Sequence, residues 1–399
     1  MPLNILISGG GCAGPTLAFF LARTNHHITI IERYPALRAT GAQIDIRAQG
    51  IQVLRRMGLL STIRSHLVDE AGVAMVDAGG NVKATFLANK SGKGAQSLTS
   101  EYEIMRGDFV RVMYEATRGY ENVQYVFGKA VEGFEQDEDG VMVKFSDGKI
   151  KRFDVLVGAD GQGSRIRRAI LADGDRDGGQ DPIKRLGLYM AYWFVRRAEI
   201  DNNIRKRILV LKSTQMRILK NCGVCLERRS KRKRRFGPRS SAEGGWETDR
   251  LIEGMQTTEN FYCQEVVQIR TDTWSRGRVV LLADAAHCPS PITGMGTTSA
   301  LVGAYVLAGE INRHPEDLQK AFENYDAVLR PFVEEIQKFN PALLRLGYPE
   351  TWFGITMLHF VAAVLEFLRI PQLVTRFSRE EKGGWRLPEY PELKLDKEI

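Results

Sequence analysis

Glycine and acidic residues near the start of the chain have the types and spacing that suit dinucleotide binding. In the run GGGCAG, Gly9, Gly11 and Gly14 follow an apolar strand pattern and open a helix pattern. Glycines at this spacing allow a tight turn, a close approach of the backbone to a pyrophosphate, and close packing of helix on strand. The N-terminus of the helix then offers free N–H groups to the anion.

An acidic residue ends the second strand of this unit. Glu32 lies 18 residues after Gly14 and directly before Arg33, where a carboxylate can accept hydrogen bonds from ribose hydroxyls. A ribose with free hydroxyls favours FAD or NAD over NADP at this position. The strand-helix-strand-acid order predicts dinucleotide binding rather than a purely structural glycine turn, and we count Arg33 with the binding residues.

A second motif lies in DVLVGADGQGSRIRR, residues 154–168. The strand pattern ends at Asp160, and Ser164 can cap the helix that follows. Taken alone, this run is equally well explained as a simple strand-to-helix turn.

The third motif lies in RVVLLADAAHCPSPITGMGTTSA, residues 278–300. Asp284 ends a buried run, at the edge of the sheet where α/β proteins hold ligands. Gly294, Gly296 and Thr297 begin a long helix, whose free N–H groups and dipole favour a negatively charged ligand. His287 in the intervening loop is more typical of a structural hydrogen bonder than of a catalytic base.

These motifs require an α/β fold around them. Short uninterrupted apolar runs such as Ile5–Ile7 and Ile28–Ile31 are typical of parallel strands covered on both faces. Alternating runs elsewhere predict a hairpin at 72–88, a meander at 123–157 and half-buried strands at 186–195 and 261–270. We therefore expect a Rossmann-like lobe with a parallel sheet, an inserted and mostly antiparallel sheet domain, and C-terminal helices.

The three motifs together resemble the FAD-dependent aromatic hydroxylases, or group A flavoprotein monooxygenases. Further runs are similar to the tetracycline-degrading and fungal secondary-metabolism members: GAQIDIR (41–47), EIMRGDF (103–109) and CPSPITGMGTTSALVGAYVLAGEI (288–311). The resemblance covers residues 1–195 and 243–345.

This resemblance assigns roles to the motif residues. It implies that the three glycines and Glu32 hold the ADP half of FAD, and that Asp45 and Arg106 contact the flavin side. It implies a role for Asp160 in binding FAD and the reduced nicotinamide, and for Asp284 in binding the ribityl or ribose chain. Residues 294–298 would place a helix N-terminus near the flavin ring, where it stabilises negative charge on reduced flavin.

The resemblance also implies an activity. It is that of an FAD-dependent monooxygenase that uses NAD(P)H and O2 to oxygenate an aromatic or polyketide-like small molecule through a flavin hydroperoxide. The alternative is an FAD-binding protein with impaired or no catalysis because its substrate domain is disrupted. The implied domains are FAD-binding segments 1–70, 100–172 and 275–345, a substrate-binding sheet domain of 71–99 and 173–274, and a C-terminal helical extension, 346–399.

The chain departs from the family pattern at three places, the first of which is Thr298, at a position often held by Asn. The usual Gly-Asp of the late motif is Ala283-Asp284, a change between small residues that leaves the acid in place. Residues 196–242 lack the expected alternation, and we interpret them as an insertion or a gene-model artefact. Within them, residues 205–239 carry 14 Lys or Arg and one acid, so the net charge of +8 belongs to this segment and the remaining chain is near −5.

Such a local charge does not make a nucleic-acid-binding fold, so no nucleic-acid partner is expected. The pair Cys222 and Cys225 lies in the same segment without a second ligand pair nearby, and no metal site is expected.

The two ends of the chain bear on localisation. The start, MPLNILISGG, runs directly into a strand pattern without the features of a signal peptide, and a cytoplasmic protein is expected. The apolar stretch 352–370 is about long enough to span a bilayer, but His359, Glu366 and Arg369 argue against an embedded span. We favour a helix packed on the FAD-binding lobe, with peripheral membrane contact through 352–370 as the alternative.

Overall fold

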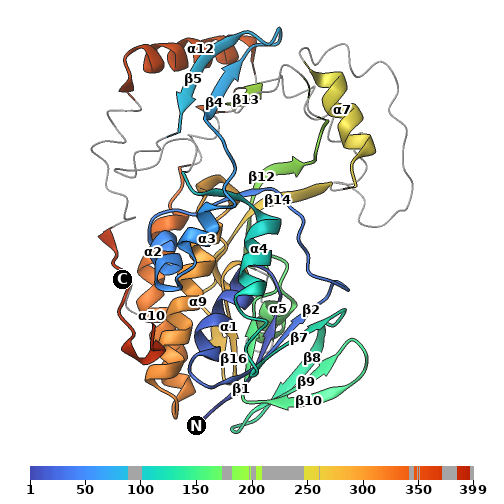
Figure 1. Cartoon of the computed structure of the whole chain (residues 1–399), viewed down its shortest axis with the longest axis vertical. Helices are drawn as coiled ribbons and strands as arrows, with labels where there is room; N and C mark the ends of the chain where they lie inside the picture. Colours follow the sequence, from blue (N-terminus) through green and yellow to red (C-terminus); the bar gives the residue numbers. More distant parts are fainter. Residues whose placement is uncertain are drawn as a thin grey trace.

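The computed structural model describes residues 1–88, 101–172, 182–196, 198, 204–208, 247–259, 261–340, 346–347, 349, 351–370 and 384–395. The lower part of the molecule in Figure 1 is built on a six-stranded sheet. Its strands, in spatial order, are β15 (Ser275–Arg276), β16 (Val279–Leu281), β11 (Val155–Gly158), β1 (Asn4–Ser8), β2 (His27–Glu32) and β7 (Val123–Phe127). All neighbours in this sheet are parallel except β15, which pairs antiparallel with β16. The expected α/β fold with a parallel sheet is therefore confirmed.

Helices cover this sheet because its central strands are apolar throughout. Residues 5–7 of β1 and 155–157 of β11 are wholly buried. The long helix α9 (Gly296–Arg313) packs against α1 (Ala13–Ala22), α2 (Gln49–Arg56) and α10 (Leu318–Gln337). Small residues along α9 allow it to be buried from Thr297 to Ile311. The remaining helices of this lobe are α3 (Leu60–Arg64), α4 (Arg106–Glu115), α5 (Arg165–Ala172), the short α8 (Asp284–His287) and the 3-10 turn η1 (Pro291–Thr293).

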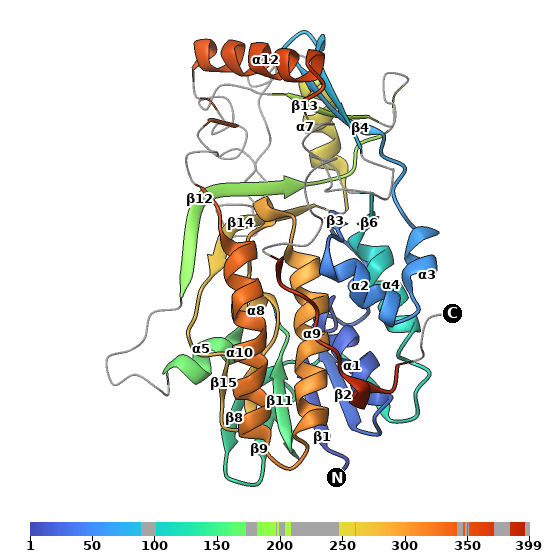
Figure 2. The same ribbon diagram turned by 90° about the vertical axis from the view of Figure 1, so that its left-hand side faces the viewer.

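The antiparallel strands form smaller sheets. A meander consists of β8 (Val131–Gln136), β9 (Val141–Phe145) and β10 (Ile150–Phe153). The predicted meander began too early, because β7 joins the parallel sheet through its register with β2. A two-stranded sheet of β12 (Ile183–Tyr192) and β14 (Tyr262–Ile269) lies between the lobe and the upper end of the molecule (Figure 2), beside α7 (Thr248–Thr257).

Two further pairings bring distant segments together. The strands β3 (Gln43–Asp45) and β6 (Glu103–Met105) pair antiparallel, so Asp45 lies opposite Glu103. At the upper end, β13 (Ile204–Ile208), β4 (Gly72–Val76) and β5 (Val82–Leu87) form a three-stranded sheet. The β4–β5 pair is the hairpin predicted from the sequence.

The C-terminal part divides between the two ends of the molecule. Helix α12 (Trp352–Phe367) packs its residues Ile355, Leu358 and Ala362 on Met75 and Phe86 of the hairpin. The expectation that it packs on the FAD-binding lobe is therefore wrong, because its apolar partners lie in the upper sheet. No helix in the described part of the chain is long and apolar enough to cross a membrane.

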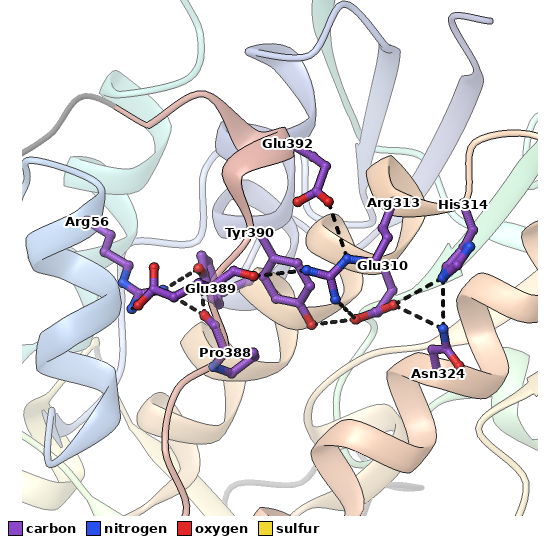
Figure 3. Close-up of polar contacts among 10 residues, drawn as sticks. Arg56, Glu310, Arg313, His314, Asn324, Pro388, Glu389, Tyr390 and Glu392 are labelled. Carbon is purple, nitrogen blue, oxygen red and sulfur yellow. Dashed lines mark hydrogen bonds and ion pairs between the residues drawn. The ribbon is translucent and has the colours of Figure 1, made fainter.

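Residues 384–395, including the 3-10 turn η3 (Pro391–Leu393), pack instead on α9 and α2. The buried Glu310 of α9 accepts a hydrogen bond from Tyr390 (2.7 Å) and pairs with Arg313 (3.3 Å), while Arg56 of α2 pairs with Glu389 (2.5 Å), as Figure 3 shows. These contacts fix α9, whose N-terminus lies in the candidate site. The division into domains by residue number stays a prediction.

Candidate active site

The glycine turn after β1 packs closely on the end of β11. Gly9 adopts φ +130°, and a Cβ there would clash with the carbonyl oxygen of Ala159. A Cβ on Gly14 would clash with the carbonyl oxygen of Gly9. Only glycine permits these approaches, so the first motif and the second, at Asp160, are in contact.

Glu32 faces this turn from the end of β2. Its Oε2 accepts the N–H of Gly10 at 3.0 Å, and its Oε1 accepts the N–H of Tyr34 at 3.1 Å. The carboxylate therefore stands beside the turn, where a ribose would lie. Arg33 is not brought there: it is exposed, and its guanidinium lies over the Tyr34 ring at 5.2 Å.

Arg106 lies where the motifs converge. It begins α4, and its Nη1 donates to the carbonyl oxygens of Arg38 (3.0 Å) and Thr40 (2.9 Å). A Cβ on Gly11 would meet only the Arg106 Nη2, at 3.5 Å, so the space before the glycine turn is bounded by this guanidinium. Burial raises the pKa of the Asp284 carboxyl, and the positive charge of Arg106 opposes this rise, so the first motif and the third interact through Arg106.

Asp284 begins α8 directly after β16. Burial raises the pKa of this carboxyl, and hydrogen bonding with Cys288 and the charges of Arg106 and Arg167 oppose the rise. The Arg167 side chain is wholly buried and donates to the carbonyl oxygens of Ala285 (3.0 Å) and Gln162 (2.8 Å). Arg167 therefore links the loop after Asp160 to the loop that carries Asp284.

Asp160 lies at the carboxyl end of β11, beside the glycine turn. Its Oδ2 accepts the N–H of Arg165 at 2.9 Å, and Ser164 accepts the N–H of Arg167 at 2.9 Å, as expected of a helix cap. Within the described residues, the buried Oδ1 of Asp160 has no hydrogen-bond partner. A buried acceptor without a partner is costly, so this oxygen is suited to a ligand hydroxyl or amide.

The N-terminus of α9 forms the other side of the site. Asp45 pairs with Arg47 at 2.9 Å, and a Cβ on Gly294 would lie 2.9 Å from the Asp45 Oδ2. The Thr298 hydroxyl accepts the N–H of Arg47 and donates to its carbonyl oxygen, each at 2.9 Å. A Cβ on Gly296 would have open space around it. Thr297 is buried in the first turn of α9. Because Gly294 lies beside Asp45 and Thr298 bonds to Arg47, the free N–H groups of this turn lie next to Asp45 and Arg47.

His287 has a structural role. Its ring lies within hydrogen-bond distance of the Ser299 hydroxyl (3.0 Å) and the Tyr325 hydroxyl (3.4 Å) and contacts Trp274. Burial lowers the pKa of His287 to about 3, so the ring is neutral at physiological pH. The expectation of a structural hydrogen bonder agrees with these contacts.

One face of the small β12–β14 sheet meets this region. Burial raises the pKa of Tyr262, the nearby Arg38 and Arg106 lower it, and Asp284 and Cys288 raise it. Tyr262 stacks on Tyr192 of β12, and its hydroxyl donates to Gln264 at 2.6 Å. Sequence reasoning did not identify Tyr262, Arg38, Arg47 or Arg167 as site residues. Of these, only Arg47 carried a signal, since it lies two positions after Asp45.

These residues fit an FAD molecule. The glycine turn with Glu32 suits an adenosine diphosphate, the unpartnered Asp160 oxygen suits a further polar contact, and the start of α9 suits an electron-rich ring. Among the described residues, no group of three His, Cys, Asp or Glu is placed to hold a metal ion. Cys222 and Cys225 lie outside the described residues, as does the basic run except for 204–208.

The fold and these residues define an FAD-binding oxidoreductase. Residues 3–339 match the FAD binding domain family, and the chain belongs to this family of FAD-dependent monooxygenases. It is 36% identical to the FAD-dependent monooxygenase asL6 of Sarocladium schorii, over 99% of this chain and 100% of that protein. It is also 36% identical to the flavin-dependent monooxygenase eupH of Phoma sp, over 90% of this chain and 91% of that protein.

A solved structure agrees with this assignment. Tetracycline destructase Tet(51) is 26% identical to the chain and superposes with a TM-score of 0.70, over 98% of this chain and 100% of that one. The resemblance inferred from the motifs is therefore confirmed, as is FAD as the cofactor.

Proposed function

We propose that this protein uses NAD(P)H as reductant and inserts one oxygen atom of O2 into an aromatic or polyketide-like molecule that binds against the β12–β14 sheet. The overall reaction balances as NAD(P)H, H⁺, O2 and a C–H substrate giving NAD(P)⁺, water and the hydroxylated product. The observation that carries the proposal is the position of Tyr262. The Arg38 guanidinium lies over the ring of this substrate-sheet residue at 5.5 Å, and Arg106, one of the expected cofactor residues, donates to the Arg38 carbonyl oxygen at 3.0 Å.

When bound, FAD supplies the redox chemistry, accepting electrons from the nicotinamide and passing them to oxygen. The chain supplies position and charge. The Gly9–Gly14 turn and Glu32 would hold the adenine half, while Asp160, Asp284 and Arg106 would hold the linking chain and the ring side. The free N–H groups at the start of α9 would stabilise negative charge on the reduced ring.

The two faces of the β12–β14 sheet differ in what they contact. Trp193 and Phe261 stack on one face, where the Trp193 ring N–H donates to the Leu251 carbonyl oxygen of α7 at 2.9 Å. Tyr192 and Tyr262 alternate with them and stack on the other face. Since Trp193 on the first face is bonded to α7 and the Arg38 guanidinium lies over Tyr262 on the second, the second face is the one we assign to substrate.

The chemistry of this face favours a flat, hydroxylated substrate. Two stacked phenol rings and Met190, which lies opposite Gln264 in the register, offer an apolar surface with a few polar groups. The Arg38 guanidinium lies over the Tyr262 ring at 5.5 Å and adds a positive charge. A phenol or enol of an aromatic or polyketide-like molecule suits this combination, and the name of Tet(51) points to such a compound for that relative.

A cytoplasmic location is part of this proposal, because NAD(P)H is supplied in that compartment. Contact with a membrane would be peripheral.

The test begins with the purified protein and its flavin spectrum. We expect a yellow protein whose oxidation of NADPH or NADH accelerates with tetracycline or 2,4-dihydroxybenzaldehyde, with one atom of ¹⁸O2 recovered in the product. Tyr262→Ala should raise KM about tenfold or more, the loss of one stacked aromatic contact, while flavin content is unchanged. The matched control Phe261→Leu changes the residue directly before β14, whose ring stacks on Trp193 away from Tyr262, and should leave KM near the parent value.

Each outcome separates a different explanation. A yellow protein that is inert toward every probe supports the alternative of a flavoprotein without catalysis. A colourless protein that does not bind added FAD contradicts the assigned cofactor site. Equal changes in KM for Tyr262→Ala and Phe261→Leu contradict the assignment of the substrate face.

A further inference from the structure

Residues 384–395, which we call the C-terminal strap, are built into the core of the cofactor lobe. Leu387, Tyr390 and Leu393 are buried in one cluster with residues of α9. The Tyr390 ring lies so close to Gly309 of α9 that a Cβ on this glycine would clash with it. Glycine is unfavourable in the middle of a helix, so this position in α9 is adapted to the strap.

Polar contacts tie the strap to two helices at once (Figure 3). The Tyr390 hydroxyl donates to the buried Glu310 carboxylate of α9 at 2.7 Å. Arg56 of α2 donates to the Pro388 carbonyl oxygen at 2.8 Å and pairs with Glu389 at 2.5 Å. Since α2 and α9 both begin in the candidate site, the strap joins the two helices on which the flavin side of that site is built.

The strap also reaches the start of α2 through Trp385. The Trp385 ring N–H donates to the Val328 carbonyl oxygen of α10 at 3.1 Å, and the ring packs on Phe332 with 5.0 Å between the centroids. The Trp385 carbonyl oxygen accepts the side-chain N–H of Gln49 at 2.8 Å. Gln49 is wholly buried. It is therefore held by a strap residue that is itself fixed on α10.

Gln49 lies next to the contact between the first turns of α2 and α9. The Thr298 hydroxyl of α9 bonds to the backbone N–H and the carbonyl oxygen of Arg47, each at 2.9 Å. A Cβ on Gly50 would lie 2.8 Å from the same hydroxyl oxygen. Because Gln49 stands between Arg47 and Gly50 in the chain, its side chain connects this contact to the strap.

The Gln49 amide has a defined orientation. Its nitrogen faces the Trp385 carbonyl oxygen, since only the NH2 group of the amide can donate to that oxygen. Among the described residues, the buried Oε1 of Gln49 has no hydrogen-bond partner. An unpartnered buried acceptor is unfavourable, and an apolar side chain of the same length would avoid it. We attribute the presence of a glutamine here to its contact with the strap.

We propose that Gln49 is a positioning residue for the flavin, through which the C-terminal strap holds the first turn of α2 against the first turn of α9. The N–H groups at the start of α9 are then fixed in place before FAD binds. Gln49 acts through Arg47 and Thr298 and not by touching the cofactor. The inference rests on the FAD site alone and does not depend on the proposed oxygenation.

The experiment measures FAD affinity and flavin midpoint potential in the full-length protein. Gln49→Met keeps the length of the side chain and removes its hydrogen bond to the strap. We expect the Kd of FAD to rise about tenfold, since losing one hydrogen bond lowers the population of the binding-competent arrangement by about that factor. The affinity for reduced flavin should fall about threefold further, the size of a helix-dipole interaction. The midpoint potential should therefore fall by about 14 mV.

Trp385→Phe tests the strap itself. It removes the N–H that anchors the strap to Val328 and leaves Gln49 in place. We expect the Kd of FAD to rise about threefold, because the ring still packs on Phe332. The double variant should bind FAD no more weakly than Gln49→Met alone, since both substitutions break the same link.

The matched control is Asn122→Asp, directly before β7 and so at the amino ends of the parallel strands, away from the site. Its amide donates to the carbonyl oxygens of Ala22 (2.9 Å) and His26 (2.8 Å), so this variant also loses hydrogen bonds from a side-chain amide to the backbone. We expect it to lower the midpoint of urea unfolding while the Kd of FAD and the midpoint potential stay at the parent values.

Three results would overturn the proposal. Gln49→Met with the FAD affinity and midpoint potential of the parent is one. Changes in Kd that multiply in the double variant would show that Gln49 acts without the strap. The same loss of affinity and potential in Asn122→Asp would show that both follow overall stability. If Gln49→Met does not fold, Trp385→Phe decides alone, and parent flavin properties in that variant would contradict the proposal.

Discussion

The backbone at Ala283, directly before the half-buried Asp284, is a site where a substitution should show how the acid is positioned. Ala283 adopts φ 55° and ψ −129°, the conformation of the first central residue of a type II′ turn. Ala48, which precedes α2, adopts almost the same backbone conformation, with φ 46° and ψ −124°. Glycine dominates in this conformation because a Cβ is strained there.

The magnitude follows from three contributions. Strain at such a residue costs about 1–3 kcal/mol, which Ala283→Gly would release. Glycine costs about 0.5–1 kcal/mol in conformational entropy, and the lost methyl group costs about 0.8 kcal/mol of burial. The free energy of unfolding should therefore change by between about −1 and about +2 kcal/mol, with a small gain as the central value. At Ala304, buried in the middle of α9, the same change releases no strain and should cost about 2 kcal/mol.

The assay compares Ala283→Gly, Ala48→Gly and Ala304→Gly by urea unfolding at a fixed excess of FAD. The quantity to measure is the difference in the change of unfolding free energy between the strained positions and the helical position, expected to be about 2 kcal/mol. The entropy and burial contributions are similar in all three variants and cancel in this difference. Equal losses of unfolding free energy in all three variants would show that the backbone is not strained at Ala283 and Ala48. Because Ala283→Gly leaves Asp284 in place, flavin content should stay that of the parent.

Three further predictions concern the flavin site and its support. Asp284→Ala should release FAD on gel filtration, since it removes a half-buried acid whose pKa the charge of Arg106 affects; a fully yellow variant would contradict this. Gly9→Ala should cost more than about 3 kcal/mol, because its Cβ would clash with backbone, whereas Gly119→Ala, with open space, should be neutral by thermal unfolding. The pKa of His287 is lowered from 6.5 to about 3, so the unfolded state binds more protons below pH 6.5. About 2 kcal/mol of stability should be lost between pH 7 and 5, and His287→Gln should lack that contribution in urea titrations.

The parallel sheet and glycine turn could be predicted because their signals are local. A short apolar run, three glycines and an acid lie within about thirty residues of one another, and each has one physical reason to occur there. The family resemblance predicted that Asp45 and the start of α9 each lie near the flavin, but not that they contact one another. The Arg47–Thr298 hydrogen bonds join residues 251 positions apart, and no periodicity encodes such a contact.

Other features depended on a choice of partner that the sequence leaves open. The apolar stretch at 352–370 predicted a helix but did not indicate what the helix packs on. In the structure, Ala362 packs in one cluster with Phe86 of the hairpin and not on the FAD-binding lobe. In the sequence, Arg167 is one of three arginines between 165 and 168, a pattern that predicts an exposed helix face. Its burial follows only from the carbonyl oxygens of Gln162 and Ala285 that receive its guanidinium.

The basic segment determines whether flavin binding and turnover go together. In the described part of the chain, the glycine turn bonds to Glu32, Arg106 donates to the carbonyl oxygens of Arg38 and Thr40, and the charges of Arg106 and Arg167 act on Asp284. We therefore expect FAD retention not to depend on residues 196–242. Turnover should depend on it if the family's substrate sheet normally continues there. Replacing residues 196–242 with the equivalent segment of asL6 should therefore raise substrate-stimulated NAD(P)H oxidation while flavin content stays constant. Sequencing the transcript across this region tests the gene-model interpretation directly, and an uninterrupted, correctly spliced frame would refute it.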